Sequence, residues 1–265
     1  MIAEAEAAQH AEHSIPLNAE LLGHLGPIPI TNAMFVSWIV TGLLVLGAVM
    51  ATRRMQLVPT GWQNFFEFVV ESLYEMLEGI LGSHLVKKTF WFFASIFIFI
   101  LTANWLGLFP IFGNITYEAH GHAVPLFRAA NSDLNMPLAI ATVYFFLWMY
   151  WSLSEVGPLG MVKHIFGPKG GLEGALKWGL LPLFFLVGVI ELVSILFRQV
   201  SLPLRLYGNV YAGESLLETM GAMFPYLLPL PFYALEILVG FIQALVFMLL
   251  TAVFTSMMCQ HEEEH

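Results

Sequence analysis

The C-terminal third of the chain carries ionisable residues in segments that are otherwise apolar enough to enter a lipid bilayer. Residues 201–215 read SLPLRLYGNVYAGES and hold Arg205 and Glu214, and Glu236 stands in the last apolar run. An ionised group at the centre of a bilayer costs about 2.5 to 3.5 kcal/mol on insertion scales. Because such groups are rare without a use, Arg205, Glu214 and Glu236 predict a functional site inside the membrane.

Helical spacing separates the arginine from the first carboxylate. Glu214 lies nine residues after Arg205, which on a regular helix is about 180° around the axis and about 13.5 Å along it. A structural ion pair would need both side chains on one face, so we expect the two residues to act on different surfaces. Asn209 follows Arg205 by four residues and shares the face of the arginine.

The other polar residues of the two final runs have structural as well as functional interpretations. Glu191 and Arg198 precede the arginine at intervals of seven and belong to the same stripe. The position of Arg198 has a structural explanation as well, because its side chain could extend to the membrane interface or neutralise the charge of Glu191. On the last run Glu236, Gly240 and Gln243 recur at steps of four and three, which places them on one helix face.

Small residues surround the arginine. Gly208, Ala212 and Gly213 follow it within eight positions, and small residues let a neighbouring helix approach closely. Pro203 removes a backbone hydrogen bond two residues before Arg205 and is expected to bend or loosen the helix there.

The composition is that of a polytopic membrane protein. Of 265 residues, 58% are hydrophobic and 11% are charged, far below the roughly 25% charged residues of soluble domains. A formal net charge of -9 gives no reason to expect a nucleic-acid partner. The first ten residues, MIAEAEAAQH, are acidic and polar, so no cleaved signal peptide is expected.

Long apolar runs predict an all-α fold of about five transmembrane helices in a single membrane domain, residues 1–265. After an outer N-terminal tail, 1–32, we expect single spans at 33–52, 89–112 and 134–153. The runs within 178–258 are too long for two perpendicular spans, so they predict a hairpin of two long, tilted or bent helices.

Residues 62–82 predict an amphipathic helix that lies on the membrane surface. Four glutamates recur at steps of four, four and three on one face, opposite a face that includes Leu73 and Leu77. A packed helix of an extramembrane domain is the alternative, but too little other polar sequence is available for such a domain.

The distribution of lysine and arginine predicts the orientation of the chain. Two connections that share one side of a five-span protein hold most of these residues, whereas the opposite connection holds only Arg128. By the positive-inside rule, we expect the N-terminus outside and the C-terminus in the cytoplasm. The residues counted on the cytoplasmic side are Arg53, Arg54, Lys87, Lys88, Lys163, Lys169 and Lys177.

No cofactor or metal site is expected from the sequence. All nine histidines lie outside the apolar runs, which argues against haem ligation within the spans. Glu118, His120 and His122 are of metal-ligand type but stand in a polar loop, where solvation is the simpler interpretation. The sequence has no Gly-rich phosphate loop and no nucleophile elbow, so the chain is not expected to be an enzyme by itself.

The stretch SLPLRLYGNVYAGE strongly resembles subunit a of F-type ATP synthases. Four further stretches resemble that family in the same order: TGWQNFFEFVVESLYE, NWLGLFP, SDLN and EILVGFIQALVFMLLTAVF. The resemblance implies two offset aqueous half-channels beside a rotating ring of c subunits, with peripheral-stalk b subunits and membrane lipid as further partners. Arg205 then matches the arginine that displaces protons from c-ring carboxylates and bars leakage between the half-channels. The residues that the resemblance assigns to the ion pathway are Glu214, Glu236, Gln243, Asn209 and Glu191.

The sequence departs from the family pattern just before the motif, where many relatives have Lys-Pro and this chain has Arg198-Gln199, with a proline at Pro203.

A sodium-coupled form of the motor is an alternative, because ligands on the partner ring decide the ion. A secondary transporter of an anionic substrate would be expected to show inverted repeats, which the sequence lacks. A purely structural scaffold subunit would leave the intramembrane carboxylates idle. The N-terminus has no Arg- and Ser-rich transit peptide, which favours a bacterial plasma (inner) membrane.

Overall fold

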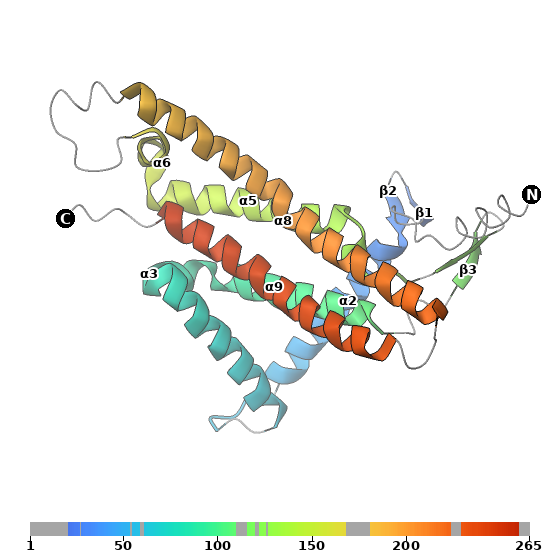
Figure 1. Cartoon of the computed structure of the whole chain (residues 1–265). Helices are drawn as coiled ribbons and strands as arrows, with labels where there is room; N and C mark the ends of the chain where they lie inside the picture. The colour runs from blue at the N-terminus through green and yellow to red at the C-terminus, as the bar shows by residue number, and fades with distance from the viewer. Residues whose placement is uncertain are drawn as a thin grey trace, which may run out of the picture. The chain divides into compact units, whose positions relative to one another are not determined.

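The computed structural model describes nine segments of the chain: 21–26, 28–53, 55–58, 61–109, 116–119, 122–125, 127–167, 181–223 and 229–259. Within them lie six α-helices (Figure 1): α2 (Asn32–Thr52), α3 (Trp62–Gly107), α5 (Asn135–Glu155), α6 (Gly157–Phe166), α8 (Leu181–Met223) and α9 (Pro229–Cys259). The sequence-based expectations for the first 20 residues of the N-terminal tail and for Arg54, Lys169 and Lys177 fall outside the described residues.

Five of these helices are long and apolar enough to cross a membrane, namely α2, α3, α5, α8 and α9. The expected fold class is therefore confirmed, since the chain is an all-α, multi-pass membrane protein. The two C-terminal helices are the long pair that the sequence predicts, with 43 residues in α8 and 31 in α9. A single perpendicular span needs only about 20 residues, so both helices have length to spare for tilting or for projecting beyond the bilayer.

Helix α3 is interrupted at one glycine. Gly82 has φ 76° and ψ 162°, outside the helical region, so α3 consists of one segment before this residue and one after it. In the first segment Leu73, Leu77 and Leu81 are buried at intervals of four, while Glu71 and Glu75 are exposed. This is the amphipathic pattern that the sequence predicts, and the position of this segment on the membrane surface stays a prediction.

Two pairs of short strands and one short helix were not anticipated. Strand β1 (Leu21–Leu25) pairs antiparallel with β2 (Ile28–Thr31), and β3 (Thr116–Ala119) pairs antiparallel with β4 (His122–Pro125). Helix α6 follows α5 directly, because Gly157 at φ 75° redirects the chain and a proline occupies the first turn. Elements this short carry too few apolar residues for a periodic signal.

The chain forms two compact units that interleave along the sequence. Unit 1 comprises residues up to 48, 99–136 and 205–244, and unit 2 comprises 49–98, 137–204 and 245–265. The two long helices contribute one half to each unit. Unit 1 therefore holds the second half of α8 with the first half of α9, and unit 2 holds the complementary halves.

Each unit has its own apolar core. In unit 1 Val36 and Val40 of α2 pack with Ala103 of α3 and with Ala130, which lies in a 3-10 turn, η1 (Ala130–Ser132). In unit 2 the ring of Tyr144 stacks with that of Phe92, at 6.3 Å between centroids. The Tyr144 hydroxyl donates to the carbonyl of Thr251, at 3.0 Å, which joins α5 to α9.

Candidate functional site

A small cavity with several polar side chains in a largely apolar wall lies within unit 1. Its volume is about 30 Å³, and a cavity of about 10–15 Å³ or more can hold a water molecule. Four of the sequence-predicted site residues line it. The lining consists of Asn209, Val210 and Glu214 from α8, Glu236, Val239, Gly240 and Gln243 from α9, Asn104, Gly107 and Leu108 at the end of α3, and Ala129.

Two contacts bring α8 and α9 together at this cavity. The amide of Asn209 donates to Oε1 of Gln243, at 2.7 Å. One turn further along α8, Gly213 faces the carboxyl group of Glu236, and a Cβ atom at Gly213 would lie 2.5 Å from Oε1 of that group. A side chain of any size at position 213 would therefore displace the Glu236 carboxyl group.

The end of α3 closes the cavity from a third direction through an asparagine pair. Asn104 is 7% exposed and donates to the carbonyl of Gly240, at 3.2 Å. Its own amide oxygen accepts from Asn131, at 2.8 Å. The next residue, Trp105, donates from its indole nitrogen to the carbonyl of Ile237, at 3.0 Å. Hydrogen bonds of this kind join transmembrane helices where apolar packing alone does not fix their register.

A buried arginine that sequence analysis used only for orientation contacts the site. Arg128 precedes η1, and its Nε atom lies 3.6 Å from Oε2 of Glu214. The two side chains are 6% and 22% exposed, respectively. Counting charges per loop could not reveal this pair, because the contact depends on how residues 127–132 pack against α8.

Arg205 has a different environment from Glu214. Its side chain is exposed on α8, and among the described residues no hydrogen bond, ion pair or ring contact involves it. Gly208, Asn209 and Ala212 are exposed on the same helix, and Gly208 has open space around its Cα. Leu202 and Leu206, three residues before and one residue after the arginine, are 3% and 0% exposed. The expected separation between the arginine and Glu214 is thus present in the geometry.

Glu191 is not part of the cavity. It is half-buried on the portion of α8 that belongs to unit 2, and the cavity lining in unit 1 does not include it. Arg198, a cation on the same portion of α8, stacks over the ring of Phe254, with its guanidinium carbon 3.5 Å from the ring centroid. It also donates to the hydroxyl of Ser194, at 3.3 Å.

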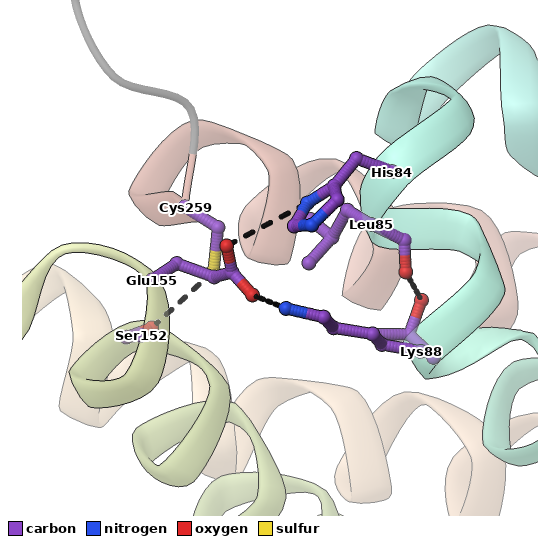
Figure 2. A network of polar contacts seen from close by, with 7 residues as sticks. His84, Leu85, Lys88, Ser152, Glu155 and Cys259 are labelled. Carbon is purple, nitrogen blue, oxygen red and sulfur yellow. Dashed lines mark hydrogen bonds and ion pairs between the residues drawn. The ribbon is translucent and has the colours of Figure 1, made fainter.

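A second polar cluster, in unit 2, joins the C-terminal ends of α5 and α9 to the part of α3 that follows Gly82 (Figure 2). Lys88 of α3 donates to Oε1 of Glu155 in α5, at 2.5 Å, and His84 lies 3.7 Å from the other carboxylate oxygen. Beside them Ser152 and Cys259 approach each other at 3.8 Å. Within the described segments no three His, Cys, Asp or Glu side chains are placed to hold a metal ion. Of the loop residues considered for a metal, His120 lies outside those segments.

Comparison with known proteins places the chain in a family. The family model described as ATP synthase A chain matches residues 34–256. The chain is 33% identical to an ATP synthase subunit a of Moorella thermoacetica over 231 residues, which is 87% of this chain and 92% of that protein. It is 34% identical to ATP synthase subunit a of Trichlorobacter lovleyi over 84% of this chain and 85% of the relative. A subunit a of Gloeobacter violaceus is 28% identical over 95% of this chain and 94% of its own length. With five apolar helices in this arrangement and a family match that spans most of its length, the chain belongs to the ATP synthase subunit a family.

Proposed function

We propose that this chain is the proton-translocating stator subunit of a rotary F-type ATP synthase, with Arg205 as its gate. The observation that carries the proposal is the environment of Arg205, an exposed cation on a membrane-spanning helix with no partner among the described residues. A permanent charge at membrane depth needs a counter-charge or water. A carboxyl group of another chain is a suitable partner for this charge. In this family the ring of c subunits would supply that carboxyl group.

The surface around the arginine supports a close approach by another helix. Gly208 and Ala212 lie beside Arg205 on the exposed face and add little bulk. Only 11% of the most apolar stretch of α8 is buried, against 44% in α3, which leaves α8 with a large area for lipid or a partner. Small residues at such a face are typical of tight helix packing in membranes.

The electrostatic effect of such an arginine is large enough for gating. At about 4 Å and an effective dielectric constant near 20, a cation stabilises a facing carboxylate by about 4 kcal/mol. A protonated carboxyl group of the c ring that arrives at Arg205 would therefore lose its proton. The resulting carboxylate would stay paired with Arg205 until rotation of the ring carries it past the arginine. A cation at this point also repels protons, which opposes direct leakage between the two sides.

The cavity of unit 1 then forms part of the outer half-channel. Its four polar residues from α8 and α9, Asn209, Glu214, Glu236 and Gln243, are able to pass a proton through side chains and one or a few water molecules. Glu191, which lies in unit 2, is proposed to belong to the path on the other side of the arginine. We assign the catalysis of ATP synthesis to other subunits of the complex. We also propose that the peripheral-stalk b subunits are neighbours of this chain.

We also propose a bacterial plasma (inner) membrane as the location, with the N-terminus outside and the C-terminus in the cytoplasm. The lysines and arginines of the described part of the chain that support this orientation include Arg53, Lys87, Lys88 and Lys163. Protease protection of epitope tags at the two ends, in spheroplasts and in inverted vesicles, tests it. Cleavage of a C-terminal tag from outside would contradict this orientation.

The gate is tested in the assembled complex reconstituted in liposomes. ATP-driven proton pumping and passive proton leak are measured for the native chain and for Arg205→Ala. We expect Arg205→Ala to abolish pumping and to raise the leak while the complex still assembles. Arg198→Ala is the matched control, because it removes an arginine of the same helix whose contacts are to Phe254 and Ser194. Normal pumping by Arg205→Ala would refute the gate and favour a transporter or scaffold.

The choice between protons and sodium has its own measurement. In the same liposomes, ATP hydrolysis and pumping are compared with and without added sodium at fixed pH. We expect no dependence on sodium for a proton-coupled motor. Stimulation by sodium, with sodium uptake into the liposomes, would instead identify the sodium-coupled form of the same machine.

A further inference from the structure

The buried pair between Arg128 and Glu214 is a feature of unit 1 that the gate does not use. Arg128 stands outside the helices, between β4 and η1, yet its side chain is 6% exposed. Glu214 is more accessible, because it lines the cavity from α8. One guanidinium group therefore sits behind a carboxyl group that faces the cavity.

The backbone that carries Arg128 is fixed in place. Ala129, Ala130, Asn131 and Ser132 are all buried, and Ala129 is itself part of the cavity wall. Gly107 at the end of α3 permits this packing, because a Cβ atom there would lie 2.6 Å from the Cβ of Ala129. Non-helical backbone at membrane depth is tolerated where protein buries it or where it lines a water-filled cavity. The position of the guanidinium group is thus built into the fold.

The charges around the cavity show what Arg128 can do. Among the described residues that line the cavity, the ionisable side chains are Glu214 from α8 and Glu236 from α9. Burial disfavours the ionised form of a carboxyl group, whereas a neighbouring cation favours it. Arg128 contacts Glu214, and no described residue forms a hydrogen bond or ion pair with Glu236. The cation therefore acts on one carboxyl group of the two.

We propose that Arg128 is a positioning residue for proton transfer, which keeps the Glu214 carboxyl group at the cavity wall and makes its ionised form accessible between transfers. In each cycle Glu214 accepts a proton from one neighbour in the cavity and gives it to another, so its charge returns to the starting value. Arg128 keeps its own proton throughout. This inference rests on the proposed function and names a residue that the arginine gate does not require.

The test is ATP-driven proton pumping into liposomes whose interior, which corresponds to the outer face, is set to different pH values. We expect Arg128→Gln to pump at least about tenfold slower at an interior of pH 7, because Glu214 then releases its proton slowly. Raising the interior pH should restore the rate, with the midpoint displaced upward by about 1–3 pH units. Arg128→Lys should keep most of the native rate and profile, and Arg198→Gln, the matched control, should pump as the native chain does.

Two results would overturn the proposal. One is a native pH profile in Arg128→Gln. The other is a loss of pumping that is equal in Arg128→Lys and Arg128→Gln and does not recover at high interior pH, since a purely structural role would behave in that way. Normal pumping by Glu214→Gln would instead contradict the role of the cavity in the proposed function, so the two failures are distinguishable.

A double variant covers the case in which Arg128→Gln does not assemble. Arg128→Gln with Glu214→Gln removes both charges, so no buried charge is left without its partner. If Arg128 acts through Glu214, the double variant should pump at the same rate as Glu214→Gln alone. A further loss in the double variant would show that Arg128 acts on something else and would overturn the proposal.

Discussion

The contact between Gly213 and Glu236 predicts a substitution that separates folding from proton transfer. Gly213→Ala adds one methyl group where α8 faces α9. The added Cβ atom would lie 2.5 Å from Oε1 of Glu236 and closer still to the carboxyl carbon and Oε2. Because the colliding atoms are the end of a flexible side chain, the carboxyl group moves and the helices do not have to separate.

The two consequences have opposite signs. Ordinary van der Waals contact begins at 3.4 Å, so the Glu236 carboxyl group must move by about 1 Å, a displacement that can cost about 100-fold in a rate that depends on geometry. Replacing glycine by alanine in a helix interior favours folding by up to about 1 kcal/mol. We therefore expect a protein of native or higher stability whose proton flux is strongly reduced.

Both quantities are measured for each variant. The reconstituted complex is assayed for ATP-driven pumping, and the free energy of unfolding is obtained by denaturant titration of the chain in detergent micelles. Gly221→Ala is the matched control, because this glycine lies on the same helix and a Cβ atom there would have no atom within 4 Å. It should show the gain in stability without the loss of flux.

A second-site change tests the cause of the loss. Glu236→Asp shortens the acidic side chain by one methylene group, so in combination with Gly213→Ala the carboxyl group can remain beside α8. We expect this combination to pump faster than Gly213→Ala alone. Native flux in Gly213→Ala, or an equal loss in Gly221→Ala, would refute the argument from the position of the carboxyl group.

Three further predictions concern stability, each measured by denaturant titration in micelles. Gly82→Ala forces an ordinary residue into the φ 76°, ψ 162° conformation and should lower the free energy of unfolding by about 1–3 kcal/mol. Gly79→Ala, in a regular part of the same helix, should not destabilise the protein. Equal effects of the two substitutions would contradict this prediction. Asn104→Leu should cost about 1–3 kcal/mol, because it leaves the buried amide group of Asn131 without the oxygen to which it donates, and an unchanged stability would be inconsistent with that hydrogen bond. Tyr144→Phe should cost about 1 kcal/mol, since its buried hydroxyl donates to a carbonyl of α9 at 3.0 Å, and a gain in stability would count against this.

The features that repeat along the sequence are the ones that could be predicted from it. Apolar runs of about 20 residues, and the much longer runs at the C-terminus, indicate the membrane helices because the bilayer sets their length. The nine-residue interval between Arg205 and Glu214 predicts opposite faces because a regular helix fixes the rotation per residue. The break at Gly82 falls where the sequence changes from an acidic amphipathic segment to an apolar one.

The features that depend on contacts between distant segments could not be predicted in the same way. Arg128 looks like a loop charge in the sequence, and only the packing of residues 127–132 brings it to Glu214. Asn104 is visible as a polar residue in an apolar run, but its bonds to Gly240 and Asn131 require three segments in a definite register. A single sequence contains the residue types of such a site and not the register that joins them.

The arrangement of α8 raises the question of how a proton passes from the cavity to the face of the arginine. Among the described residues that line the cavity, Asn209 is the exposed one, and it lies one helical turn from Arg205. Its amide nitrogen donates to Gln243 inside the cavity, which leaves the amide oxygen available to a water molecule. A carboxylate at this position would pair with the arginine and neutralise it, whereas an amide cannot. In the proposed function, an uncharged relay at Asn209 would therefore let the cavity reach the arginine's face while Arg205 stays free to attract the carboxyl group of a partner.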